Sequence, residues 1–240
     1  MSAYDHFLKK GSIAFDVGAY IGERTDMFLA LGCTRVIAVE ATNEHSSRLR
    51  KKYAADNRVI VLAKAAGPRN EKGVLRVHES FWPNGTRMDS ALSTMSKEWL
   101  EGIDENADQW DKRFEHPDWI HRSSEWREEQ QVEIVTIDSL ISEYGEPDFI
   151  KIDVEGWECE VIKGLTHPVK ALSFEFNTLL KLEWAEEVVD HLLRLSSYEF
   201  NYIAQDSLEF SLPNWFSKIE LFADLQGRVI HGDIFARRLQ

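Results

Sequence analysis

The first part of the chain alternates apolar runs with a helical pattern. Residues 13–17 are an apolar run, a helical pattern follows Gly22 and reaches Leu31, and a second apolar run occupies residues 35–39. Short apolar runs are typical of buried strands, and Gly32 is well suited to end a helix. We therefore expect a strand, a glycine-containing turn, a helix and a second strand, followed by the acid Glu40.

The same alternation continues along most of the chain. We expect helices at residues 44–55, 137–144, 156–164 and 183–195, and strands at residues 58–66, 132–136, 148–154 and 171–176, with a short β-like segment at 74–77. The later runs at 199–203, 218–223 and 229–236 resemble an antiparallel edge. Alternating β and α segments predict an α/β fold with a mostly parallel sheet that is covered by helices on both faces.

Residues 80–130 interrupt this pattern. They contain five of the eight tryptophans, and apolar residues from Trp99 to Phe114 recur at helical spacing. Ser96 is suited to cap such a helix and Pro117 to stop it. We predict one domain over residues 1–240, with this partly helical insertion lying over the site as a lid or substrate wall. The alternative is that its aromatic side chains only pack onto the domain.

The turn after the first strand has features of a nucleotide site. Gly18 permits a tight turn, Gly22 permits close approach at the start of the helix, and the helix N-terminus favours an anion. Glu40 follows Gly18 by 22 residues, close to the spacing at which an acid binds ribose hydroxyls. The spacing GxxxG differs from the GxGxxG of pyrophosphate sites. A ribose and a carboxylate together indicate S-adenosylmethionine, whereas the alternative is that the glycines serve packing alone.

A second group of polar residues follows the strand at 148–154. Lys151, Asp153 and Glu155 alternate, which places them on one face near the carboxyl end of that strand. Ligands of parallel α/β sheets bind beyond these ends, where we also expect Asp16, Glu40 and Glu175. An acidic cleft suits the cationic sulfonium of S-adenosylmethionine. The alternative is that Lys151 merely neutralises Asp153 or Glu155 as a buried structural pair.

These segments resemble the FkbM-like family of S-adenosylmethionine-dependent O-methyltransferases. The resemblance is strongest in DFIKIDVEGWECEVIKG (148–164), and it extends to FDVGAYIGERT (15–25), RVIAVE (35–40), VTIDSL (135–140), FEF (174–176) and GDIFAR (232–237). These stretches span the predicted scaffold but not the insertion.

The resemblance implies a class I methyltransferase fold, a seven-stranded sheet whose last hairpin is antiparallel. It implies methyl transfer to a hydroxyl of a small molecule, a sugar or glycan, or a secondary metabolite. Expected cofactor contacts are Asp16, Gly18, Ala19, Tyr20, Gly22, Thr25, Glu40, Ala41 and Ala65, with Asp153 near the methionine end. Ala41 replaces the proline usual in the family, and residues 64–66 lack an acidic partner for adenine.

Methylation of an alcohol calls for a general base. The candidate catalytic residues are Asp153, Glu155, Glu175 and Lys151, with the histidines His78 and His167 as weaker candidates for the base. An alternative use of Asp153, Glu175 and Asn177 is to bind a divalent cation such as Mg²⁺, which prefers oxygen ligands.

Composition narrows the class of partner. The 240 residues carry a formal net charge of −13, which disfavours a nucleic-acid substrate. The Asn-Pro-Pro-aromatic motif of many base-methylating enzymes is absent. Two cysteines, no apolar signal segment and no run long enough to span a bilayer predict a cytoplasmic protein. Two other functions stay open: an NAD(P)-dependent Rossmann-type oxidoreductase, and a non-catalytic module that binds a partner through its tryptophans.

Overall fold

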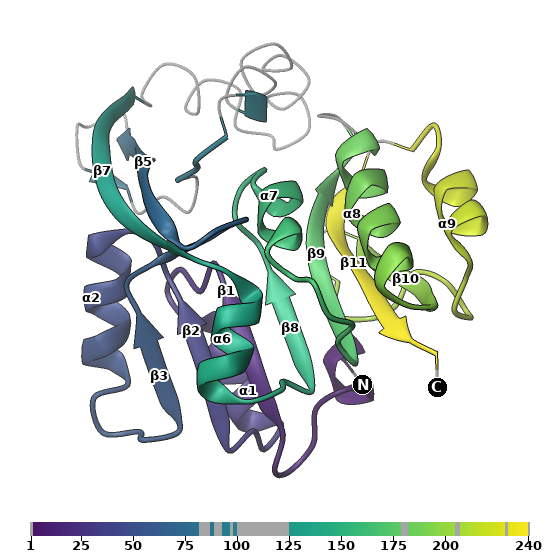
Figure 1. Ribbon diagram of the computed structural model, residues 1–240, viewed down its shortest axis with the longest axis horizontal. Coiled ribbons are helices and arrows are strands. Elements are labelled where there is room, and N and C mark those ends of the chain that lie inside the picture. The colour runs from purple at the N-terminus through teal and green to yellow at the C-terminus, as the bar shows by residue number, and fades with distance from the viewer. Residues whose placement is uncertain are drawn as a thin grey trace.

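A central seven-stranded sheet organises the chain (Figure 1). The computed structural model describes residues 2–81, 87–88, 93–96, 98–99, 125–178, 182–204, 207–228 and 230–239, with 78–81, 87–88 and 125–128 described by backbone alone. The strands run in the order β10-β11-β9-β8-β1-β2-β3. Their bounds are β1 Ile13–Val17, β2 Arg35–Val39, β3 Val59–Leu62, β8 Phe149–Ile152, β9 Ala171–Asn177, β10 Tyr198–Ala204 and β11 His231–Arg238.

The pairing confirms the predicted fold class. β1 is parallel to both β2 and β8, and the pairs β2–β3 and β8–β9 are also parallel. β11 is antiparallel to β9 and to β10, so that the C-terminal strands form the expected antiparallel part of the sheet. The carboxyl ends of β1, β2, β8 and β9 consequently lie at one edge of the sheet, which is the upper edge in Figure 1.

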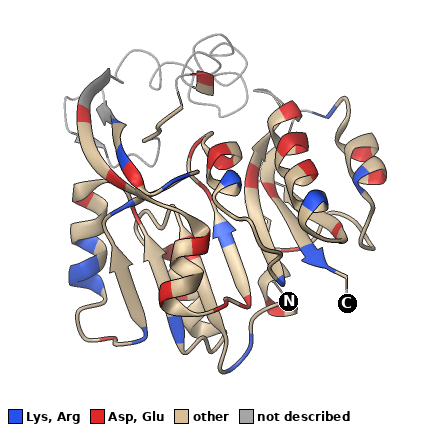
Figure 2. Cartoon of the chain, viewed as in Figure 1, with Lys and Arg blue, Asp and Glu red and all other residues tan. Residues whose placement is uncertain are grey.

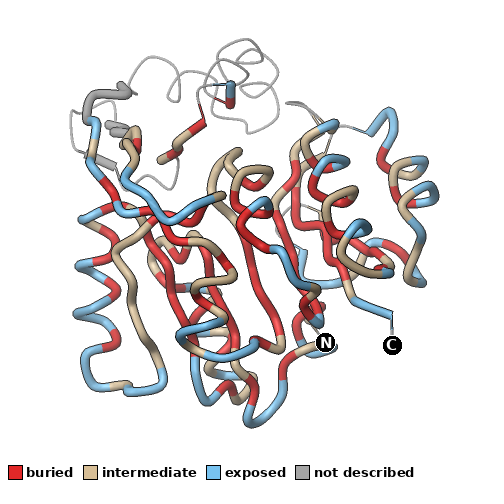
Figure 3. The backbone as a smooth tube through the Cα atoms, in the orientation of Figure 1, coloured by how far each residue is buried: buried red, intermediate tan, exposed pale blue. Residues whose placement is uncertain are grey.

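Helices cover both faces of this sheet, as the alternating pattern predicts. One face packs on α6 (Ile137–Tyr144), α7 (Glu158–Lys163), α8 (Leu182–Leu195) and α9 (Lys218–Leu225). The other packs on the 3-10 helix η1 (Ala3–His6), α1 (Glu23–Ala30) and α2 (Asn43–Lys52). The inner strands are buried on both sides, visible as continuous red segments in Figure 3. Among the described residues, no helix combines the length and apolar character needed to cross a membrane.

A second sheet of four strands stands above the carboxyl edge of the first. It has the order β4-β7-β5-β6, with β4 Ala65–Ala66, β5 Glu71–Phe81, β6 Arg87–Met88 and β7 Glu125–Val135. The prediction of one strand at residues 58–66 was therefore wrong. The pairing of β3 with β2 ends at Leu62, and Ala65 of β4 then pairs with Ile134 of β7. An apolar run gives no sign of this change of partner, because both parts are apolar.

The edges of the predicted insertion were also misjudged. Residues 80–81, 87–88 and 125–130 belong to the strands of the second sheet. Inside the insertion, the Oγ of Ser96 accepts a hydrogen bond from the Trp99 N–H at 3.1 Å, which confirms Ser96 as a helix cap. The remainder of the predicted helix, with Phe114 and Pro117, lies outside the described residues, as does the proposed lid.

The expectation of a strand at residues 218–223 was wrong, because this segment begins α9. Ser217 caps the helix: its Oγ accepts from the Glu220 N–H, and the Glu220 carboxylate accepts from the Ser217 N–H. The signal for this capping box, serine followed three residues later by glutamate, is present in the sequence. The apolar character of the segment obscured it.

Candidate active site

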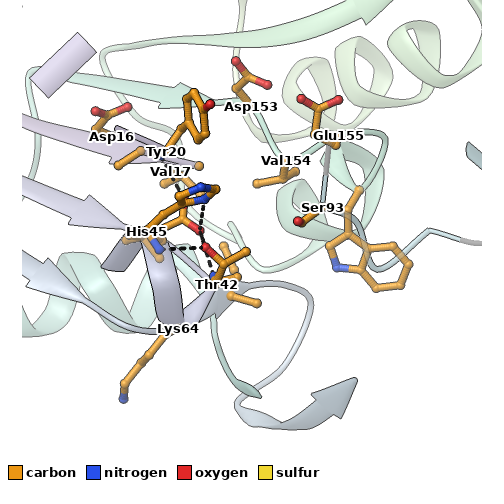
Figure 4. Close-up of a pocket in the computed structure, with 18 of the residues that line it drawn as sticks. Asp16, Val17, Tyr20, Thr42, His45, Lys64, Ser93, Asp153, Val154 and Glu155 are labelled. Atoms are coloured by element: carbon orange, nitrogen blue, oxygen red, sulfur yellow. Dashed lines mark hydrogen bonds and ion pairs between the residues drawn. The ribbon is translucent and has the colours of Figure 1, made fainter. Parts of the chain in front are cut away.

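A pocket lies at the carboxyl ends of β1, β2 and β8, with the second sheet forming one wall (Figure 4). It encloses about 980 Å³ of empty space, part of it open to solvent. Strand ends supply Asp16, Glu40 and Asp153, while Ala65 and Leu75 come from the second sheet.

The turn after β1 depends on its first glycine. Gly18 has φ +85°, and its N–H donates to the carbonyl of Val39 at 2.9 Å. A Cβ on Gly18 would lie 1.6 Å from the Asp153 carbonyl oxygen, so only glycine permits the ends of β1 and β8 to approach this closely. Gly22 starts α1, and its carbonyl accepts a hydrogen bond from the Tyr53 hydroxyl at 2.9 Å.

The carboxylate of Glu40 is held in place before any ligand binds. One oxygen accepts from the Tyr20 N–H at 2.9 Å, and the other accepts from the N–H and the hydroxyl of Thr42, each at 2.7 Å. Tyr20 reaches it because its φ is +47°, and its ring lies edge-on to His45 (Figure 4). Glu40 is 6% exposed and lines the pocket, and its carboxylate has lone pairs beyond those used by Tyr20 and Thr42.

Asp16 is completely buried beside the same pocket. Its Oδ2 accepts from the hydroxyl of Thr25 at 2.6 Å, whereas its Oδ1 has no hydrogen-bond partner in the part of the chain that the structure describes. Burial raises the pKa of the Asp16 carboxyl, and the charge of Lys151 acts in the opposite direction. A buried acceptor without a donor is costly in a folded protein, so this oxygen is an unusual feature of the site.

Lys151 and Asp153 form an ion pair below the pocket, with 2.5 Å between Nζ and Oδ2. Lys151 is 4% exposed. Figure 2 shows a blue segment on β8 and red segments on α7 and β9. Burial lowers the pKa of Lys151, but the neighbouring carboxylates of Asp153, Asp233 and Asp16 outweigh this effect and raise it. The arrangement is the buried structural pair that the sequence left as an alternative for Lys151.

Three carboxylates meet beside this pair. Oxygens of Asp153, Glu155 and Glu175 all lie within 4.8 Å of one another, although Glu155 follows the end of β8 in a turn with φ +54°. Burial, followed by the charge of Asp153, raises the pKa values of Glu155 and Glu175 well above 4.5. Burial also raises the pKa of the nearby Glu158 to about 7. These groups therefore hold protons more strongly than exposed carboxylates do.

A second, smaller pocket adjoins the acids. It encloses about 380 Å³ of empty space, part of it open, between the end of β9 and the starts of α7 and α8. Glu175 and Asn177 line it together with the aromatic side chains of Trp99, Phe176 and Trp184. Consecutive residues of the turn after β8 line different pockets. Glu155 and Trp157 line the first pocket, and Gly156 and Glu158 line the second. One turn thus separates the two spaces.

Most of the predicted site residues surround the first pocket. Its lining includes Asp16, Gly18, Ala19, Tyr20, Glu40, Ala41, Ala65, Lys151, Asp153 and Glu155. Gly22 and Thr25 lie behind it, Gly22 as the cap of α1 and Thr25 as the donor to Asp16. His167 is on the surface beside Asp138, its side chain 82% exposed, and is not among the lining residues. The His78 side chain lies outside the described residues.

The sequence predictions missed several lining residues. Thr42 caps α2 by accepting from the His45 N–H at 3.3 Å, and the threonine before this helix was a recognisable signal. Arg24 and Trp157 line the pocket from the first turn of α1 and from the residue before α7. Their positions follow from helix orientation, which residue spacing did not show.

Comparison with known proteins agrees with this geometry. The family model described as the methyltransferase FkbM domain matches residues 16–202. The chain belongs to the FkbM methyltransferase family. The matched region contains the glycine turn, Glu40 and the acids after β8, and membership in this family favours methyl transfer over the oxidoreductase alternative. No curated protein matches this chain.

Two solved structures are similar to this chain over most of its length. A structure of methyltransferase FkbM from Methylobacillus flagellatus KT is 15% identical with a TM-score of 0.52, and the match covers 94% of this chain but only 43% of that one. Precorrin-6y C5,15-methyltransferase from Geobacter metallireducens GS-15 is 12% identical with a TM-score of 0.45, covering 98% of this chain and 84% of that one. The first likeness supports the fold of this FkbM-family chain.

Proposed function

We propose that this protein is an S-adenosylmethionine-dependent O-methyltransferase that acts on a hydroxyl of a small molecule, a sugar or glycan, or a secondary metabolite. The observation that carries the cofactor assignment is the pair of binding points across the first pocket. Glu40 offers oriented acceptors for ribose hydroxyls, and the unpartnered Oδ1 of Asp16 offers one for an ammonium. A ligand that presents both donors, as an adenosyl amino acid does, fits this chain.

Asp153 is suited to the sulfonium, because it lines the same pocket as Asp16 and Glu40 and also belongs to the cluster of three carboxylates. When bound, the cofactor supplies an electrophilic methyl group that transfers to the acceptor oxygen as the C–S bond breaks and the C–O bond forms. The chain must hold the acceptor oxygen in line with that bond, a positioning effect that contributes several kcal/mol in such reactions, on the order of 7–11 in the best cases.

Glu155 and Glu175 are the better candidates for the base. Oδ2 of Asp153 is already engaged in the ion pair with Lys151. By contrast, no described residue donates a hydrogen bond to the side chain of Glu155 or Glu175, and their raised pKa values make them stronger proton acceptors than ordinary carboxylates. In this proposal Lys151 positions Asp153, and one of the two glutamates takes the proton.

The acceptor is proposed to enter from the second pocket, whose polar rim includes Glu175 and Asn177. The net charge of −13 supports a small acceptor over a nucleic acid. Free Cys33 and Cys159 are consistent with the cytoplasmic location we propose. The alternative cation site of Asp153, Glu175 and Asn177 would gain a further carboxylate from Glu155, but activity in the presence of a chelator would remove that alternative.

Two measurements test the function. Titration calorimetry should show that S-adenosylhomocysteine binds and that NAD does not; the opposite result would overturn the cofactor assignment. Release of S-adenosylhomocysteine should then be measured against sugars, polyketide-like alcohols and matched amines. Release above the acceptor-free background with hydroxyl compounds is expected, and release with the amines alone would rule out O-methylation.

A further inference from the structure

The second pocket combines aromatic walls with carboxylates. Its lining includes the aromatic side chains of Trp99, Phe176 and Trp184, and the acids Glu158 and Glu175. Among the described residues that line it, none is a lysine, an arginine or a histidine. Aromatic faces and carboxylates are the two kinds of group that attract an organic cation in a protein, the first through the ring quadrupole and the second through charge.

The turn after β8 holds one aromatic wall of this pocket in place. Gly156 has φ +82°, and a Cβ on it would lie 2.1 Å from an atom of the Trp99 ring, so glycine makes room for the indole. The neighbouring carbonyl of Glu155 accepts a hydrogen bond from the Thr94 hydroxyl at 2.6 Å. Thr94 and Trp99 are both buried. Packing and a hydrogen bond therefore fix the position of the Trp99 ring over the turn.

Glu158 is a buried acid that forms no ion pair with any residue in the described ranges. It is 8% exposed, it lines the pocket, and its Oε1 accepts from the Val154 N–H at 3.0 Å. No described side chain donates to either of its oxygens. Burial raises its pKa to about 7, although backbone N–H groups act in the opposite direction. A buried carboxylate is costly unless a positive charge accompanies it, so a cation in this pocket would be stabilised by Glu158.

The other charges around the pocket are also mostly negative. After burial, the largest effects on the pKa of Glu175 come from four carboxylates, each of which raises it: Asp153, Glu155, Glu158 and Asp233. Lys151 offsets one of these charges through its ion pair with Asp153. The remaining acids leave an excess of negative charge beside the pocket, and such an excess attracts a cationic ligand.

We propose that the second pocket binds an organic cation, and that the methyl acceptor therefore carries an ammonium group near its hydroxyl. The aromatic faces contact the ammonium and Glu158 supplies the opposite charge. The hydroxyl then lies toward Glu155 and Glu175, whose oxygens belong to the cluster of three carboxylates. Amino sugars and amino alcohols are acceptors of this class. This inference rests on the proposed function and adds to it the charge of the substrate.

The test compares choline with its neutral carbon analogue, in which a tert-butyl group replaces the trimethylammonium. Both compounds have a hydroxyl and nearly the same shape, so a difference in affinity reports the charge. Titration calorimetry uses the full chain saturated with S-adenosylhomocysteine, at a pH above the Glu158 pKa of about 7. Choline should bind roughly 10- to 100-fold more tightly than the neutral analogue. Equal affinities, or no detectable binding of choline, would overturn the cation site, and this comparison needs no variant to fold.

Three variants locate the site. Glu158→Gln should bind both compounds with similar affinity, and its fold should tolerate a neutral side chain because burial already favours the protonated acid. Glu160→Gln removes a charge from the same helix outside the pocket, where Glu160 pairs with Lys163, and should keep the full preference for choline. Trp184→Leu should weaken choline more than the neutral analogue. A full preference for choline in Glu158→Gln would show that this acid serves only the start of α7 and would overturn its role.

Turnover separates this inference from the proposed function. Choline has no N–H, so S-adenosylhomocysteine released in its presence reports transfer to oxygen. Among hydroxyl acceptors, those with an ammonium should have a kcat/KM about 10-fold or more above that of their uncharged N-acetyl or carbon analogues. Efficient methylation of neutral alcohols with no advantage for the cationic ones would overturn the inference and leave the proposed function intact. Failure of the wild type to bind S-adenosylhomocysteine at all would overturn the proposed function itself.

Discussion

The ammonium of Lys151 lies 2.5 Å from Oδ2 of Asp153, and the lysine side chain is 5% exposed while that of the aspartate is 31% exposed. The pair links the central strand β8 to the floor of the pocket. Because Lys151 is enclosed, its charge depends on the acids around it, and Asp153 is the nearest of them. A change at Asp153 will thus affect the fold as well as the chemistry.

Replacing Asp153 with alanine should destabilise the protein by about 2–4 kcal/mol, because it leaves a buried ammonium without its closest partner. Urea unfolding of D153A and of the wild type will measure the loss. A surface control is Glu44→Ala, which removes an exposed pair with Arg48 and should cost less than about 1 kcal/mol. Similar losses for both variants would contradict an enclosed pair at Lys151.

Gly18→Ala should be far more harmful than alanine at another glycine of positive φ. Gly18 combines φ +85° with a Cβ position 1.6 Å from the Asp153 carbonyl, whereas Gly11, with φ +99°, has nothing within 4 Å. The backbone term alone costs about 1–2 kcal/mol, which is the expected loss for G11A. Thermal unfolding should show a loss several kcal/mol larger for G18A, because β1 and β8 must separate. Equal losses would mean that the close approach is unimportant.

The Glu40→Gln substitution should weaken the binding of an adenosyl ligand, because Glu40 is proposed to accept from its ribose hydroxyls. The amide keeps the shape but replaces one carboxylate oxygen that accepts from Tyr20 or Thr42, and its remaining oxygen is a weaker acceptor. We expect the affinity for S-adenosylhomocysteine to fall by roughly 10-fold. Calorimetry with the 2′-deoxy ligand provides the control: the wild type should prefer the ribose form, and E40Q should lose most of that preference. An unchanged preference would place the ribose elsewhere.

The stability of the protein should depend on pH through Glu158. Burial raises its pKa to about 7 in the folded state, above the ordinary value of 4.5, so the folded protein binds the proton more tightly than the unfolded chain. Stability from this group is greatest below pH 4.5 and falls as the pH rises to about 7. Urea unfolding at several pH values should show that the free energy of unfolding falls less with rising pH in E158Q than in the wild type. The difference between the two falls should reach at most about 3 kcal/mol. Identical slopes for both proteins would contradict the raised pKa.

The pH–rate profile should identify the base. Because burial and Asp153 raise the pKa values of Glu155 and Glu175, the wild-type kcat should rise with pH through an ionisation well above 4.5. Substituting the base with glutamine should lower kcat by about 10²- to 10⁴-fold and remove that rise. The glutamine variant at the other position is the matched control and should retain the profile. If neither E155Q nor E175Q lowers kcat, neither residue is the base.

Local patterns were sufficient for most of the scaffold and for the acids that follow its central strands. Three local features predict where the pocket lies: the apolar run before Gly18, the acid Glu40, and the alternating polar residues after Phe149. They are sufficient because parallel strands bring their carboxyl ends to one edge of the sheet, whatever the details of packing. The family resemblance rests on these same segments. Period, glycine position and charge are properties of neighbouring residues, so they can be found without coordinates.

Tertiary structure decided what each side chain does there. Lys151 and Asp153 alternate with Glu155 in sequence, yet the strand ends at Ile152, so Lys151 is buried in an ion pair while Glu155 turns toward Glu175. Arg24 gave no signal in the sequence, because its surroundings in the pocket include Tyr4 and the distant Asp233, which the fold brings beside α1. Burial and the distances between charges come from segments far apart in the chain, and no local pattern contains them.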